Sequence, residues 1–125
     1  MKHIIISALY LLTLFCLSHF VFDPSYLYNE IPWLDIPMHI MGGFGVASLT
    51  GAILSYRGSK VSYFKLFAVY FVVAIVWEAY EHIMNYIHLN IWYGLRTPSV
   101  DIVDTVKDLF DGLLGMSAAY LFVRK

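Results

Sequence analysis

Apolar side chains fill four stretches of the chain, each about 20 residues long, and short polar segments separate them. A helix needs about 20 mainly apolar residues to cross the hydrocarbon layer of a membrane. No stretch alternates apolar and polar residues as a strand with one buried face would. The pattern therefore predicts an all-α fold, a four-helix transmembrane bundle with spans at about 4–22, 35–56, 63–86 and 102–123.

The segments between these stretches carry residues that end helices. Asp23-Pro24 follows the first stretch, Arg57-Gly58-Ser59-Lys60 follows the second, and Thr97-Pro98-Ser99 precedes the fourth. Proline and glycine commonly mark such boundaries. No internal repeat or change in composition divides the chain, so we expect one polytopic membrane domain over residues 1–125. The first stretch lacks a signal-peptide cleavage pattern, and we expect it to remain as a span.

The composition supports a lipid environment. The chain has 125 residues, of which 60% are hydrophobic and 14% are charged, whereas soluble domains have about 25% charged residues. The net charge of -1 offers no basic footprint for nucleic acid. The single cysteine, Cys16, excludes an intramolecular disulfide and a cysteine-based zinc site. The expected partner is therefore the lipid bilayer.

Lysines and arginines indicate how the bundle is oriented. Lys2, the loop 57–65 and the pair Arg124-Lys125 all fall on one side of a four-span arrangement. Such residues concentrate on the cytoplasmic side of membrane proteins. We therefore expect both termini to be cytoplasmic.

Acidic and histidine side chains gather at the opposite ends of the last three stretches. They are Asp35, His39, Glu78, Glu81, His82, Asp104, Asp108 and Asp111. Insertion scales penalise a charged group near the bilayer centre by about 2.5–3.5 kcal/mol. At about 100° per residue, the members of each group share one helix face. The pattern predicts one polar site, facing outside, where the three helices meet.

A divalent metal is one way to hold several carboxylates in a medium of low dielectric. Carboxylates placed together repel one another and take up protons unless a cation balances them. Carboxylate and imidazole ligands suit zinc, manganese or iron. We expect His39, Glu78, His82 and Asp104 to hold the metal. The alternative is a hydrated, partly protonated cluster, as in proton relays and cation pathways.

Other polar residues receive separate roles. Glu81 or Asp108 would act as the general base, and Arg96 and Asp35 would contact the substrate, Arg96 through an anionic headgroup. Lys107 is expected to pair with a neighbouring acid, above all Asp111 four residues on. Asp101 is placed to cap the fourth helix.

The order of these residues resembles a known group of membrane proteins. The matching elements are Asp35-x-x-x-His39, Glu78-x-x-Glu81, Arg96-x-x-Ser99, and Asp108 ahead of Gly112 and Gly115. They are similar to the VanZ-like small bacterial membrane proteins and the related YjdF-type family. The resemblance implies a multi-span protein of the bacterial cytoplasmic (inner) membrane, linked in one branch to glycopeptide resistance. It implies no particular reaction.

Three functions fit these observations. The leading one is a metal-dependent membrane hydrolase or transferase acting on a lipid-linked or envelope substrate. The second is an ion, metal or proton transporter working as an oligomer. The third is a non-catalytic membrane protein with a structural metal site. An enzyme needs an open coordination position, a structural site is closed, and a transporter needs polar groups on both sides.

Overall fold

A computed structural model describes residues 1–23, 27–92, 94 and 101–124, and these form a bundle of four long helices. The long helices are α1 (Lys2–Leu17), α3 (Asp35–Tyr56), α4 (Tyr63–Tyr86) and α5 (Ile102–Val123). Shorter helical pieces are Ser18–Phe22, α2 (Leu27–Glu30), Pro32–Leu34 and Ile87–Trp92. The described residues contain no strand. The predicted all-α class is confirmed, and the long helices occupy the predicted stretches.

Local side-chain chemistry sets where two of these helices begin. The Asp101 carboxylate accepts hydrogen bonds from the backbone N–H of Val103 (2.9 Å) and Asp104 (3.4 Å), which confirms Asp101 as the N-cap of α5. The Ser62 hydroxyl accepts from the backbone N–H of Lys65 at the start of α4. Both contacts satisfy N–H groups that lack a partner in the first helical turn.

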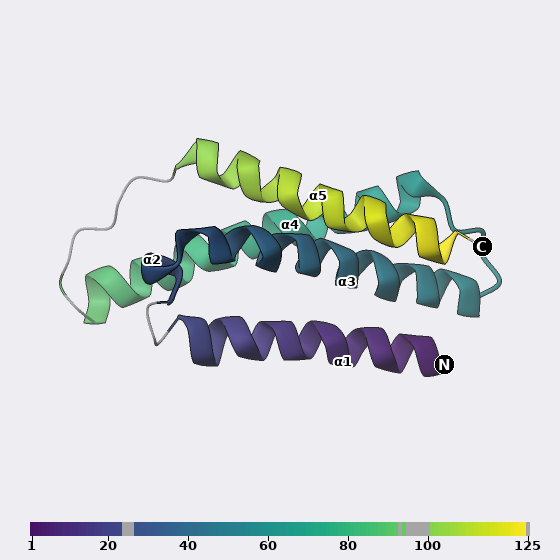
Figure 1. The fold of residues 1–125 in the computed structure, drawn as a ribbon, viewed down its shortest axis with the longest axis horizontal. Helices are drawn as coiled ribbons and strands as arrows, with labels where there is room; N and C mark the ends of the chain where they lie inside the picture. Colours follow the sequence, from purple (N-terminus) through teal and green to yellow (C-terminus); the bar gives the residue numbers. More distant parts are fainter. Residues whose placement is uncertain (24–26, 93, 95–100, 125) are drawn as a thin grey trace.

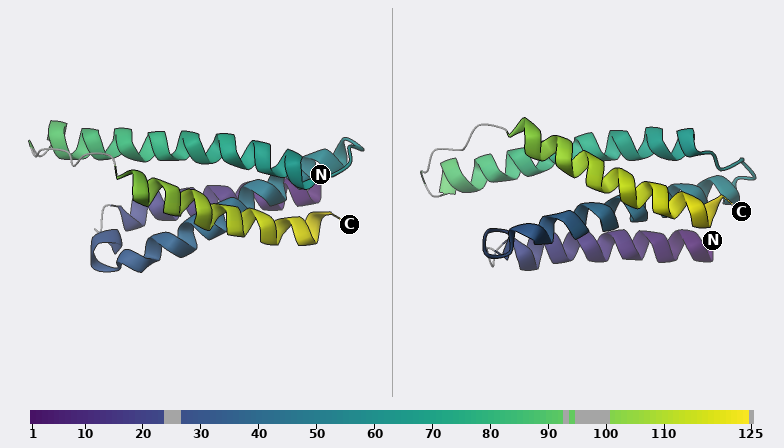
Figure 2. Two further views of the ribbon diagram at one scale, coloured as in Figure 1. Left: turned by 90° about the horizontal axis from the view of Figure 1, so that it is seen from above. Right: turned by 45° about the horizontal axis from the view of Figure 1, so that its top comes forward.

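The central helix of the bundle is α3, which packs against α1, α4 and α5. Its most extensive partner is α5, and Figure 2 shows α5 crossing the bundle obliquely. The two chain termini lie at the same end of the bundle (Figure 1). This arrangement agrees with an even number of crossings, although the side of the membrane on which the termini lie stays a prediction.

Glycines bring α3 and α5 into backbone contact. A Cβ atom added at Gly43 would lie 1.9 Å from the carbonyl oxygen of Gly112, and one added at Gly115 would lie 1.8 Å from that of Ile40. No side chain fits at such distances. Small residues allow this close approach in lipid, where apolar burial alone does not drive helices together.

Apolar residues divide between a small core and a large outer surface. The buried core consists of Ala47, Leu66, Tyr70, Met116 and Ala119. Many large apolar side chains on α1, α4 and α5 are exposed, as expected of helices that face lipid. Within the described part of the chain, three segments are long and apolar enough to cross a membrane: Lys2–Phe22, Pro32–Tyr56 and Tyr63–Tyr86.

The fourth predicted span, α5, has the required length of 22 residues but carries more charge. Asp104, Lys107, Asp108 and Asp111 all lie in its first half. Composition alone therefore does not identify α5 as a span. Its crossing of the membrane stays a prediction, supported by its backbone contact with α3.

Charge separates the bundle into two ends. The acidic end contains the start of α3, the end of α4 and the first half of α5, and it holds all the acidic residues of the long helices. The basic end contains both termini and the α3–α4 turn, and it holds Lys2, Arg57, Lys60, Lys65 and Arg124. Lys107 is the basic exception on a long helix at the acidic end.

Candidate functional site

A cavity of about 280 Å³ lies among α1, α3, α4 and α5 and extends inward from the acidic end. Its polar lining consists of Ser18, Tyr28, Asp35, His39, Glu78, Glu81 and Asp108. Its apolar lining includes Leu11, Leu14, Val46, Val73, Ala74 and Trp77. The predicted gathering of polar groups from three helices therefore occurs in the structure, and it occurs beside a hollow.

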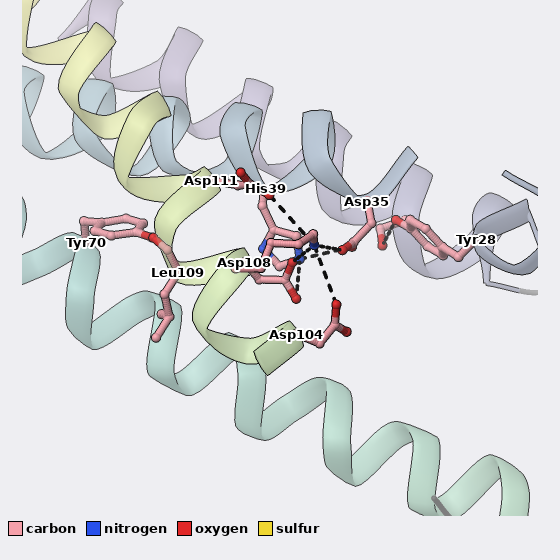
Figure 3. A network of polar contacts seen from close by, with 10 residues as sticks. Tyr28, Asp35, His39, Tyr70, Asp104, Asp108, Leu109 and Asp111 are labelled. Carbon is pink, nitrogen blue, oxygen red and sulfur yellow. Dashed lines mark hydrogen bonds and ion pairs between the residues drawn. The ribbon is translucent and has the colours of Figure 1, made fainter. Parts of the chain in front are cut away.

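His39 stands at the centre of the polar lining. Its Nε2 atom lies 3.1 Å from Asp35 Oδ1 on the same helix and 3.7 Å from Asp108 Oδ2 on α5. The spacing of four residues places Asp35 and His39 on one face of α3. Figure 3 shows Asp35 and Asp108 beside the His39 ring, each reaching it from its own helix.

Two groups of three side chains share His39, and each is compact enough to hold a metal ion. Asp35, His39 and Asp108 form one group, and His39, Glu78 and Glu81 form the other. In each group, one potential ligand atom per residue lies within 4.8 Å of the others. Glu78 is 8% exposed, and Asp108 is 5% exposed. These groups unite α3, α4 and α5 at a single polar centre.

Among the described residues, Lys107 is the lysine or arginine that forms ion pairs with this centre. Its Nζ atom lies 2.5 Å from Asp108 Oδ1 and 3.2 Å from Asp35 Oδ2. The predicted ion pair with Asp111 is present at 3.8 Å, but it is the longest of four, and the shortest two are those to Asp108 and Asp35. The sequence could not show this preference, because Asp35 belongs to another helix.

Asp111 is left with a buried oxygen. Its Oδ2 atom has no hydrogen-bond partner within the part of the chain that the structure describes, and the residue is 9% exposed. Lys107 lies within ion-pair range of this atom but too far for a hydrogen bond. Asp111 therefore adds negative charge next to the site without a full partner of its own.

Comparison with known proteins places the chain in a membrane protein family. A family model described as "Predicted membrane protein (DUF2238)" matches residues 4–125. The chain belongs to this family. No curated protein and no solved structure matches the chain. The family confirms the expected small membrane protein, and the likeness to VanZ-like and YjdF-type proteins stays a resemblance.

Other predicted site residues of this family member lie outside the two groups. Asp104 does not line the cavity, and its side chain is 63% exposed and lies 3.7 Å from Lys107. His82 is half-buried on α4, and neither of the two groups includes it. Arg96 lies outside the described residues. Of the four predicted metal ligands, the structure thus brings His39 and Glu78 together and adds Glu81.

The structure also adds lining residues that the sequence pattern did not single out. The Tyr28 hydroxyl lies 2.8 Å from the Ser18 hydroxyl at the polar end of the cavity. Burial raises the pKa of Tyr28, so this group is a neutral hydrogen-bonding partner. At the inner end, the Tyr70 hydroxyl donates to the Leu109 carbonyl oxygen at 2.5 Å. Ser18 within an apolar stretch was the one available sequence signal.

Proposed function

We propose that this protein is a membrane-embedded enzyme, a metal-dependent hydrolase or transferase acting on a lipid-linked or envelope substrate. The observation that carries the proposal is the group His39, Glu78 and Glu81 at the polar end of a cavity with apolar walls. Small-molecule sites commonly combine apolar walls with a few convergent polar groups. The cavity gives these three ligands direct access to a substrate.

The distribution of positive charge favours this group over the other. Lys107 makes short contacts with Asp35 and Asp108, so these two carboxylates already have a cation. Among the described residues, no lysine or arginine forms an ion pair with Glu78 or Glu81. A divalent cation at Glu78 and Glu81 would balance the charge that Lys107 leaves uncompensated.

The chemistry of the donor set suits zinc, manganese or iron. Three protein ligands leave a coordination position for water or substrate, as in catalytic zinc sites. A bound cation would supply an activated water or polarise a phosphoryl or acyl oxygen. Asp108 lines the same cavity and contacts His39, so it is placed to accept the proton of the attacking water.

The proposed membrane placement rests on the distribution of charge. The basic end would face the cytoplasm, because lysines and arginines concentrate there in membrane proteins. The site at the acidic end would then open toward the outer face of the bacterial cytoplasmic membrane. Envelope lipids and their precursors are accessible from that side.

Two alternatives predict different surroundings for the polar groups. A purely structural metal site would be closed by a fourth protein ligand, whereas these residues line a cavity. A transporter would need polar groups continuing toward the basic end. There, the buried core of the described bundle is formed by residues such as Ala47, Leu66 and Met116. Both features favour the enzyme.

Elemental analysis of the purified protein tests the metal. After equilibration with Zn²⁺, Mn²⁺ or Fe²⁺ and removal of free metal, we expect one ion per chain in wild type. Glu78→Gln and His39→Ala should each lose it. Loss of a residue that only supports a metal ligand already weakens such sites by tenfold or more, about 1.4 kcal/mol, and these two residues would bind the metal directly. Asp104→Asn should retain it, since Asp104 is an exposed carboxylate outside both groups.

The same variants separate the competing interpretations. Wild type without bound metal, and with unchanged thermal stability on chelation, would contradict the proposal and leave a protonated carboxylate cluster. Loss of metal in Asp104→Asn or His82→Ala would instead support the ligand set predicted from the sequence. Metal retained in Glu78→Gln but lost in Asp35→Asn would move the ion to the group that contacts Lys107.

A further inference from the structure

We propose that the substrate enters the cavity sideways from the lipid, between α1 and α4, and that its hydrocarbon chain occupies the apolar part of the cavity. The substrate class is then a lipid whose polar head reaches the His39 centre. This inference rests on the proposed function for its chemical meaning, but the seat for a hydrocarbon chain can be tested without metal or turnover.

The cavity changes in character along the helices. On α3 its lining runs from Asp35 to Val46, which is about 16 Å at a rise of about 1.5 Å per residue. On α4 it runs from Glu81 to Tyr70, about the same length. Polar groups occupy the end near Asp35 and Glu81, and apolar groups occupy the rest. A lipid in the outer leaflet has the same order, with a polar head at the interface and a chain toward the midplane.

The side of the cavity between α1 and α4 is closed by rings rather than by backbone packing. Phe15 and His19 of α1 and its extension meet Trp77 and Tyr80 of α4, and we call these four residues the aromatic seam. Phe15 packs edge-on against Trp77 with ring centroids 6.2 Å apart, and the Tyr80 hydroxyl lies 2.7 Å from His19 Nδ1. Side-chain rotation alone can open such a closure, because α1 packs mainly against α3.

Exposure on this side agrees with an entrance. Val73 and Phe15 both line the cavity, yet they are 41% and 36% exposed. Their outer surfaces therefore face the surroundings of the bundle while their inner surfaces face the hollow. In a membrane those surroundings are hydrocarbon, so a chain can pass between them without contact with water.

The inner end of the cavity is a fixed floor. Tyr70 is 4% exposed, and its hydroxyl is bound to the Leu109 carbonyl of α5. A Cβ atom at Gly112 would come within 2.5 Å of the same hydroxyl, so the ring is held tightly. The cavity has a volume of about 280 Å³. It therefore suits part of one chain, and a second chain of the same lipid would remain in the bilayer.

Photolabelling tests this seat. The probe is phosphatidylglycerol with a diazirine at the end of one acyl chain, incorporated into phosphatidylcholine vesicles that contain the metal-free full-length protein. We expect the chain end to label the inner lining, around Leu11, Val46 and Tyr70. Excess unlabelled phosphatidylglycerol should suppress this labelling, because the cavity holds a limited number of chains.

A matched pair of variants separates the cavity from the lipid-facing surface. Ala74→Trp fills the apolar wall, whereas Ala79→Trp adds the same ring at an exposed position of the same helix that does not line the cavity. Labelling of the inner lining should fall about tenfold in Ala74→Trp, which corresponds to about 1.4 kcal/mol, and stay unchanged in Ala79→Trp. If Ala74→Trp does not fold, suppression of wild-type labelling by unlabelled phosphatidylglycerol still tests whether the cavity holds the chain.

The outcomes distinguish this inference from the proposed function. Labelling confined to outward-facing residues, or equal in the two variants, or insensitive to competitor, would overturn the chain seat. Saturable labelling of the inner lining in a protein that binds no metal would support the seat and contradict the metal enzyme. Bound metal in a protein whose inner lining is not labelled would support the metal enzyme and contradict the chain seat.

Discussion

The two halves of the bundle differ in how closely the same helices pack. Toward the basic end, Ala47, Met116 and Ala119 have no exposed surface, and the backbone contact of α3 with α5 at Gly43, Gly112 and Gly115 lies where this half meets the other. Toward the acidic end, the helices leave a cavity and place Glu78 and Asp108 around it. In lipid, close packing has to supply the association energy that apolar burial supplies in water. The tightly packed half therefore holds the helices in place while the polar half remains hollow.

The largest effect should come from disrupting the backbone contact between α3 and α5. Gly115→Val should lower the free energy of unfolding by about 3 kcal/mol or more, since overpacking costs about 1–3 kcal/mol even where side chains can shift. Here the added Cβ would meet the Ile40 carbonyl, which is helix backbone. Thermal unfolding in detergent micelles measures the change.

Gly42→Ala is the matched control for that substitution. Gly42 belongs to α3 and lines the cavity. A Cβ atom added there meets no heavy atom within 4 Å. Its unfolding temperature should match wild type or rise slightly, because alanine favours the helix by about 1 kcal/mol over glycine. Equal destabilisation by both substitutions would show that the glycine contact does not hold the bundle together.

A smaller effect is expected from removing the cation of the polar half. Lys107→Met leaves Asp35 and Asp108 without their short contacts. Hydrogen bonds to charged groups contribute about 1.5–3 kcal/mol, and a loss in that range should appear in thermal unfolding. Added Zn²⁺ should recover part of it, because Asp35, His39 and Asp108 can then hold a metal.

Lys65→Met at the basic end provides the comparison. Lys65 is exposed and donates to Ser59 and to the Lys60 carbonyl oxygen, so its loss should stay within about 0.5 kcal/mol. If the two lysine variants unfold alike, the Lys107 contacts contribute no more to stability than an ordinary surface lysine.

The smallest effect belongs to the boundary between the halves. Tyr70→Phe removes the hydrogen bond to the Leu109 carbonyl while keeping the ring, and it should cost about 0.5–1.5 kcal/mol. Tyr63→Phe removes an exposed bond to Ser117 and should cost less. A larger loss from Tyr63→Phe, measured in the same unfolding assay, would argue against Tyr70 as the floor that joins the halves.

Much of the architecture was predictable because a membrane helix requires a stretch of about 20 mainly apolar residues, which is visible in the sequence. The stretches at 35–56, 63–86 and 102–123 coincide with α3, α4 and α5. The Asp101 cap followed from its position before an apolar run. The small residues Gly43, Gly112 and Gly115 lie where α3 and α5 come into backbone contact.

The partners within the site were less predictable. Helical spacing shows which residues share a face, but it does not give the rotation of one helix against another. The sequence therefore gave Asp104 and His82 the role of metal ligands beside His39 and Glu78, and Glu81 or Asp108 that of general base. The structure groups Glu81 and Asp108, rather than Asp104 and His82, with His39. Lys107 likewise has a neighbour from another helix, Asp35, that local spacing cannot reveal. The cavity itself, which lies between helices, has no sequence signature.

The charge carried by α5 has a consequence for how the chain is made. A helix with Asp104, Lys107, Asp108 and Asp111 in its first half is a poor candidate for independent insertion into a bilayer. Its partners, Asp35 and the glycine surface of α3, are synthesised earlier. We therefore expect α5 to enter the membrane late and against α3, so that biogenesis and assembly of the site become one event. Substitutions at Gly43 or Asp35 should then change the topology of the C-terminus as well as the stability of the finished protein.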